Sequence, residues 1–241
     1  MRKRFEILTS HHETSLKRYY PIAQEVVTGT YLGESDYVLS LLDTCYFPTR
    51  EGVRNFHDIY VDALLVAGKQ KMAAGNPAEA VKLYEKAFEY PENHQVFLVD
   101  GRTTRDAQIY AFIAQAYEKA GQDDEARSAW EKAAAVNVKS SDYRYWKGLA
   151  LQKLGDKAGA KALFKALVND GKDSVVDHFV NFFGAEGNTG YTVEGINAKA
   201  WYTAGLGELG LGKKSRAKKC FKKSFNLAPE NLWTKHMLEE K

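Results

Sequence analysis

Apolar residues recur at helical spacing along most of the chain, and glycines interrupt them at intervals. Between residues 106 and 133, an apolar helical face is broken at Gly121 and resumes at Ala126 and Trp130. This pattern is typical of two antiparallel helices joined by a tight turn. The same layout recurs 34 residues later, around Gly155.

Five glycines of this kind share a sequence context. Each lies nine residues before a bulky apolar residue, and the last four lie five residues before an alanine. We therefore expect five helical hairpins within a single domain over residues 1–241. The turn glycines are Gly33, Gly75, Gly121, Gly155 and Gly212, and the predicted hairpins cover roughly 12–46, 59–91, 106–137, 142–168 and 197–228.

The turn glycines are 42, 46, 34 and 57 residues apart, so three of the four steps carry insertions. The longest insertion, 169–191, is predicted to begin with an extra short helix that includes Val175 and to end in a mobile, glycine-rich surface loop. After Pro229, a capping helix is predicted over 230–240. Its expected buried side consists of Leu232, Trp233, His236 and Met237.

Small residues in one helix and bulky residues in the next predict close packing of the two helices. Small residues in the first helices are expected to face a bulky residue of the adjacent helix, where a larger side chain would push the pair apart. These small residues are Gly68, Ala114, Gly148 and Gly205, and the bulky residues expected between successive hairpins are Tyr84, Trp130 and Phe164.

A period of 34 residues with a glycine at each turn resembles the tetratricopeptide repeat. The closest copy is the last, although Glu208 stands where tyrosine is usual; its matching residues are Trp201, Gly205, Gly212, Ala217, Phe221 and Pro229. The resemblance implies an all-α, right-handed solenoid of antiparallel helical hairpins with about five repeats.

Three strings, at residues 45–52, 90–93 and 181–184, are more distinctive than the repeats. With the repeats around them, they look similar to the C-terminal region of large bacterial proteins in which such an array follows a galactose-mutarotase-like domain of unknown function. This resemblance implies that the chain is part of a protein of carbohydrate metabolism, and that the missing N-terminal domain is a possible partner. Thr49 departs from the tryptophan expected there, and no catalytic residue carries over.

Composition and charge exclude several classes of protein. The chain is 44% hydrophobic and 27% charged, which is ordinary for a folded domain. No apolar run approaches the ~20 residues that span a bilayer, so a cytoplasmic location and no membrane partner are expected. A formal charge of +3 is too small to indicate nucleic acid. Cys45 and Cys220 are predicted to be packed thiols because they lack the close spacing of metal or redox sites.

Candidate chemistry is weak throughout the sequence. The glycine-rich string at 205–210 matches a dinucleotide-binding fingerprint, but it is expected inside a helix, whereas that fingerprint needs a strand before it. Histidines are scattered, and no nucleophile elbow is present. We therefore predict no enzyme activity, no metal and no cofactor.

A basic run marks the last hairpin. Its apolar positions, Ala217, Cys220, Phe221 and Ser224, are expected to face inward, so the cations should cover the outer face. A solvated face is the favoured interpretation, and an acidic partner or nucleic acid is the alternative. The run consists of Lys213, Lys214, Arg216, Lys218, Lys219, Lys222 and Lys223.

In the repeat pattern the first helices line the concave face, where two tyrosines with amides and lysines could hold an extended peptide. A groove that holds only water, or that is filled by its own side chains, is an equally favoured interpretation. The sequence thus favours a protein-interaction scaffold; an accessory module of a carbohydrate-active enzyme is the alternative, and a basic-face nucleic-acid binder is a weaker one. The predicted partner-binding residues are Gln108, Gln115, Lys119, Tyr145, Lys153 and Tyr202.

Overall fold

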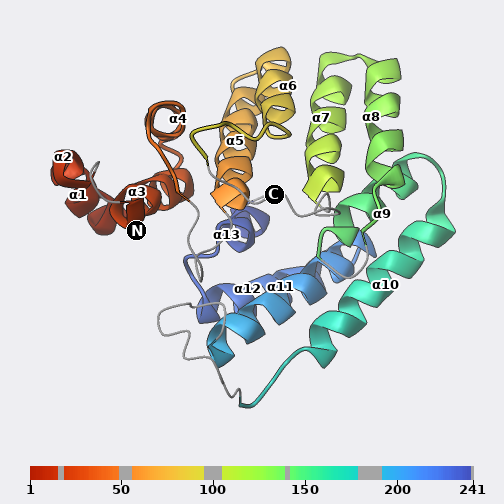
Figure 1. Ribbon diagram of the computed structural model, residues 1–241. Helices are drawn as coiled ribbons and strands as arrows, with labels where there is room; N and C mark the ends of the chain where they lie inside the picture. Colours follow the sequence, from red (N-terminus) through yellow and green to blue (C-terminus); the bar gives the residue numbers. More distant parts are fainter. Residues whose placement is uncertain (16–18, 49–55, 95–104, 139–141, 179–191, 240–241) are drawn as a thin grey trace. The chain divides into compact units, whose positions relative to one another are not determined.

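The computed structural model describes residues 1–15, 19–48, 56–94, 105–138, 142–178 and 192–239. In this part of the chain the regular elements are α-helices, apart from one isolated bridge between Phe47 and His94. The fold is therefore all-α and built of helical hairpins, as predicted (Figure 1). The chain divides into two compact units, Met1–Ala129 and Trp130–Lys241.

In the first unit, α3 packs against α4 and α5 packs against α6, so each pair forms a hairpin. An unpredicted helix, α1, precedes them and packs on α3. The helices of this unit are α1 (Arg2–Ser10), α2 (His12–Ser15), α3 (Tyr19–Leu32), α4 (Ser35–Thr44), α5 (Phe56–Ala73), α6 (Pro77–Lys86) and α7 (Asp106–Ala120).

In the second unit, α10 packs against α9 and α11, and α11 packs against α12. Figure 1 shows α10 and α11 side by side over much of their length. The helices are α9 (Arg144–Lys153), α10 (Lys157–Asp173), α11 (Val193–Gly210), α12 (Lys214–Leu227) and α13 (Leu232–Glu239), and the boundary between the units falls within α8 (Asp123–Ala135).

All five predicted turn glycines adopt the left-handed conformation, with φ between 71° at Gly121 and 95° at Gly155. They are the only residues with positive φ in the described part of the chain. A side chain at such a position would clash with the backbone, so glycine is the residue that lets one helix end and the next begin after two or three residues. The turn predictions are confirmed.

The small residues predicted at helix contacts also lie where expected. A Cβ at Gly148 would come within 2.5 Å of the Phe164 ring, and one at Gly205 would come equally close to Phe221. Gly68 lies against the Tyr84 ring in the same way. These glycines are required because the rings of the adjacent helix occupy the space of a side chain. For Ala114 the expectation stays a prediction.

Two of the three distinctive strings come together in the first unit. The Phe47 backbone amide donates to the Asn93 carbonyl at 2.8 Å, and the Asn93 side-chain amide donates to the Leu42 and Cys45 carbonyls at 2.8 and 2.7 Å. His94 is buried beside the Phe47 ring, with ring centroids 5.2 Å apart. We call this set of contacts the loop clasp. The third string, 181–184, lies outside the described residues.

The long insertion differs from its prediction. Helix α10 runs to Asp173, past the predicted end at 168, because its last turn packs on α11 through Gly171. Residues 175–178 are not helical; instead, the Asn197 side chain bonds to both the backbone N–H and the backbone carbonyl of Val176, at 2.8 and 2.9 Å. The predicted extra helix therefore does not begin at Val175, and its remainder and the predicted loop lie outside the described residues.

The capping helix forms, but its buried side was predicted wrongly. Thr234 is the fully buried residue of α13, and its hydroxyl lies 3.0 Å from that of Ser224 in α12. A pair of hydroxyls thus joins α13 to α12, and a search for apolar residues misses such a contact. The residues predicted to be buried are only half-buried: Leu232, Trp233, His236 and Met237.

Candidate functional site

The structure divides the six predicted partner-binding residues into a buried and an accessible set. Gln108, Tyr145 and Tyr202 have exposed fractions of 1%, 6% and 4%. Gln115 is half-buried, and Lys119 and Lys153 are exposed. The expectation that the two tyrosines and Gln108 point into an open groove therefore differs from the structure.

The neighbours of the two tyrosines explain why they are buried. The Tyr145 ring lies between its neighbour Trp146 and Phe164 of α10, with ring centroids 5.1 and 5.9 Å away. The Tyr202 ring centroid lies 6.0 Å from that of Phe221 in α12. Both tyrosines therefore fill contacts between helices of their own unit, which is the self-packed alternative that the sequence left open.

Gln108 belongs to a buried polar network in the first unit. Its side-chain oxygen accepts a hydrogen bond from Arg105 at 3.1 Å, and Arg105 also pairs with Asp62 of α5 at 2.6 Å. A buried charge is stable only when it is paired and hydrogen-bonded. Gln108 therefore helps to satisfy the guanidinium that joins α5 to the start of α7, and it is not accessible to a partner.

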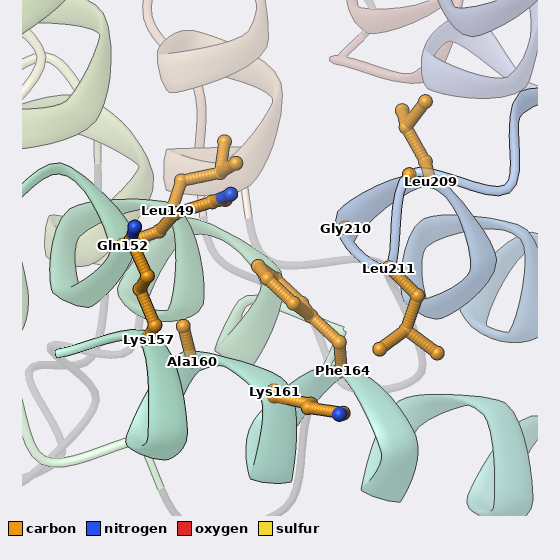
Figure 2. A pocket seen from close by; sticks show the side chains of 10 residues that line it. Leu149, Gln152, Lys157, Ala160, Lys161, Phe164, Leu209, Gly210 and Leu211 are labelled. Atoms are coloured by element: carbon orange, nitrogen blue, oxygen red, sulfur yellow. The ribbon is translucent and has the colours of Figure 1, made fainter. Parts of the chain in front are cut away.

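An accessible hollow does occur in the second unit, where α9 and α10 meet the end of α11. This apolar pocket has a volume of about 370 Å³. Its apolar side chains include Leu149, Phe164, Leu209 and Leu211. Figure 2 shows the Phe164 side chain directed from α10 into the space between Leu149 on one side and Leu211 on the other. The pocket thus offers an apolar wall to a side chain from outside.

Glycines set the spacing of α10 and α11 beside the pocket. A Cβ at Gly207 would lie 2.6 Å from the Phe164 carbonyl oxygen, and one at Gly171 would lie 2.5 Å from the Ala204 backbone nitrogen. The two helices therefore contact each other through their backbones. The glycine-rich string 205–210 lies within α11, as predicted; Gly207 and Gly210 serve the close packing on α10, and Gly205 faces the Phe221 ring of α12.

A second pocket, of about 530 Å³, shares Lys161 and Leu211 with the first. Its walls carry five cations and a single carboxylate, Glu208, which is 5% exposed. The Glu208 carboxylate lies 3.5 Å from the Lys213 ammonium. We call this hollow the basic pocket; its cations are Lys161, Lys165, Lys172, Lys213 and Arg216.

The charge of the basic pocket is largely uncompensated. Four of these cations form no ion pair among the described residues, and all four are exposed to solvent: Lys161, Lys165, Lys172 and Arg216. A cation of α9 differs: Arg144 pairs with Asp170 of α10. Several unpaired cations in one hollow attract anions over distances of about a Debye length.

The sequence located only part of this site. Lys213 and Arg216 lie in the basic run, whose exposed cations and buried stripe of Ala217 and Phe221 are confirmed. The three lysines of α10 were missed. Their positions, 161, 165 and 172, fall on one helical face, and this spacing could have predicted a basic face on α10. The spacing says nothing of the neighbour, because only the fold brings α10 next to the start of α12.

Other candidate chemistry remains sparse in the described residues. Cys45 and Cys220 are buried free thiols, as predicted, and burial raises the pKa of both. No group of three or more side chains suited to a metal ion occurs among the residues that the structure describes. Over the same residues, no helix is both long and apolar enough to cross a membrane. A cytoplasmic location stays a prediction.

Comparison with known families identifies the hairpins. Two family models, both described as tetratricopeptide repeat, match the chain: one at residues 107–137 and 198–231, the other at 142–170. The chain therefore contains tetratricopeptide repeats. The second resemblance, to proteins with a galactose-mutarotase-like domain, stays a prediction.

Two solved structures are similar to this chain at low identity. One, entitled "Crystal structure of YrrB: a TPR protein with an unusual peptide-binding site", is 16% identical, with a TM-score of 0.34 over 97% of this chain and 98% of that one. The other, "Crystal structure of MamA", is 21% identical, with a TM-score of 0.28 over 70% and 79%. The family models, rather than these similarities, identify the repeats.

Proposed function

We propose that this protein is a non-catalytic scaffold that binds a segment of another protein, or a neighbouring domain, through the second unit. The observation that carries the proposal is the apolar pocket beside α9, α10 and α11, which lies within two matched repeats. Stacked repeats of this kind form extended surfaces for partners. A pocket of this size is large enough for an apolar side chain of a bound segment.

The predicted first-helix face contributes to this proposal in a modified form. Leu149, half-buried on α9, lines the apolar pocket, and Lys153 lies one helical turn further along the same helix. We include Lys153 as a rim contact that would meet a carboxylate. Gln115 and Lys119, which belong to the first unit, are proposed contacts of that unit. Tyr145 and Tyr202 are proposed to position the helices and not to contact the partner.

A selection from a displayed library of random 12-residue peptides, with the full chain as bait, tests the proposal. We expect peptides that bind the chain one to one with micromolar affinity. Leu211→Asp should weaken that binding at least tenfold, because it places a carboxylate in the wall of the pocket. Fluorescence polarisation with labelled peptides gives the affinity.

Leu227→Asp is the matched control, since Leu227 is an exposed leucine on α12 that lines neither pocket. This variant should bind as the unaltered chain does. Circular dichroism verifies that both variants are folded. Equal binding by both variants would show that peptides bind elsewhere, and a selection that enriches no peptide would overturn the scaffold proposal.

A further inference from the structure

The basic pocket and the apolar pocket form one continuous surface, because Lys161 and Leu211 line both. From the uncompensated charge and this continuity, we infer that the segment bound by the second unit is acidic, with carboxylates in the basic pocket and one apolar side chain in the apolar pocket. This inference rests on the proposed function and adds the chemical class of the partner to it.

The spacing of the lysines along α10 fits an extended segment. Lys161 and Lys165 are one helical turn apart, so their Cα atoms are separated by about 6 Å along the axis. In an extended peptide, side chains on the same face recur every two residues, or about 6.8 Å. Acidic residues at alternate positions of a segment running along α10 would therefore face the two lysines in turn.

The order of the two pockets sets the order of residues in the segment. Lys157 and Lys161 of α10 line the apolar pocket, whereas Lys161, Lys165 and Lys172 line the basic pocket. The apolar side chain of the partner should therefore lie next to the acidic residue that faces Lys161, and the other acidic residues should follow along α10 towards Lys172.

A nucleic acid fits this surface less well than a peptide. Proteins that hold single strands combine cations with aromatic faces on which bases stack. The aromatic residue of the apolar pocket, Phe164, is only 2% exposed, and one face of the Trp201 ring already holds the Lys223 ammonium, 3.8 Å from its centroid. The pocket offers leucines, which suit an aliphatic side chain.

The test compares two double charge reversals with equal spacing. In Lys161→Glu/Lys165→Glu, both changes lie in the basic pocket, whereas in Lys218→Glu/Lys222→Glu they lie on the exposed face of α12 outside it. Each pair is four residues apart on one helix, and each variant changes the net charge equally. The probes are peptides from the library selection and a labelled single-stranded oligonucleotide of 12 thymidines.

We expect the selected peptides to be enriched in aspartate and glutamate flanking an apolar residue. The reversal at 161 and 165 should weaken peptide binding roughly tenfold, and raising the salt from 50 to 500 mM should weaken it comparably. The reversal at 218 and 222 should change the affinity less than twofold. A thermal melt of each variant verifies that the second unit is folded.

The outcomes separate this inference from the proposed function. Selected peptides without an acidic excess, or an equal loss in both reversals, would overturn the acidic assignment and leave the scaffold in place. Oligonucleotide binding lost only in the reversal at 161 and 165 would also overturn it, in favour of nucleic acid. A failure to select any peptide would overturn the scaffold and the inference together.

Discussion

The two units differ in the contacts that hold together the helices on either side of their insertions. In the second unit, α10 and α11 contact each other through their backbones at Gly171 and Gly207. In the first unit, the loop clasp uses side chains of Asn93 and His94, which bond to carbonyls at the end of α4. Both contacts lie beside an insertion: α10 and α11, which flank the longest insertion, meet through glycines, whereas the end of α4 is joined to residues 93 and 94 by polar side chains.

The same difference bears on function. Close packing of α10 and α11 fixes the helices that form the two pockets of the second unit. The hydrogen bonds of the loop clasp are used to satisfy backbone groups within the first unit. We therefore expect partner binding to depend on the second unit and the loop clasp to matter for stability alone.

The largest expected effect is that of Gly171→Ala. The new Cβ would lie 2.5 and 2.6 Å from backbone atoms of Ala204 and Ala200, which cannot move aside without shifting α11. We expect the free energy of unfolding to fall by about 3 kcal/mol, at the upper end of the cost of overpacking. Denaturant unfolding measures the loss, and hydrogen exchange should locate it in the second unit.

Gly159→Ala is the matched control, because Gly159 lies in the same helix and its Cβ would meet no backbone atom of α11, only the exposed Asp156 side chain that caps the start of α10. It should change the free energy of unfolding by less than about 1 kcal/mol, the scale of helix propensity. Equal losses in the two variants would contradict the view that backbone contact makes Gly171 necessary.

A smaller loss is expected from Asn93→Ala in the first unit. This change removes two hydrogen bonds and leaves the Cys45 carbonyl without its side-chain donor, whereas the Leu42 carbonyl keeps its bond to His94 Nε2 at 2.8 Å. The cost should be about 2 kcal/mol, and the loss of hydrogen-exchange protection should stay within the first unit. Asn76→Ala is the control, since the Asn76 side chain makes no capping hydrogen bond to α6. Protection lost equally in both units would contradict the comparison.

The smallest expected effect is a pH dependence of the first unit. His57 is partly buried and stacks on Tyr90, with ring centroids 4.0 Å apart, and burial lowers its pKa to about 4. The unfolded chain binds the proton more readily, so stability is lost as the pH falls from about 6.5 towards 4. His57→Gln should reduce this loss by on the order of 1 kcal/mol, after discounting for the exposed part of the ring.

Asp106 provides the control for this measurement, because its pKa is shifted in the opposite direction. Burial raises the pKa of Asp106 to about 6, so its contribution has the opposite sign: stability is lost as the pH rises from about 4 to about 6. Asp106→Asn should therefore steepen the acid-induced loss. Burial also lowers the pKa of His94, which stays in both variants. Denaturant unfolding at pH 7 and 4.5 checks both signs, and an unchanged slope in both variants would contradict the assignment.

Much of the fold could be predicted from the sequence, but much of the candidate site could not. The turn at Gly155 and the buried stripe around Phe221 follow from residues close together in the chain, so local patterns were sufficient. The burial of Tyr145 depends on Phe164, nineteen positions away on the next helix. Periodicity gives the face of a helix on which a residue lies, but not what covers that face.

The sequence by itself determined where the helices turn, because a left-handed residue almost requires glycine and five glycines recur in one context. It also determined the inward stripe of α12, because helical spacing fixes which residues share a face. Only the tertiary structure decided which faces stay open. The two pockets combine α10 with the turn from α11 to α12, and the contacts of Gly171 and Gly207 set that combination. Such contacts depend on how two helices fit together, which no single stretch of the chain contains.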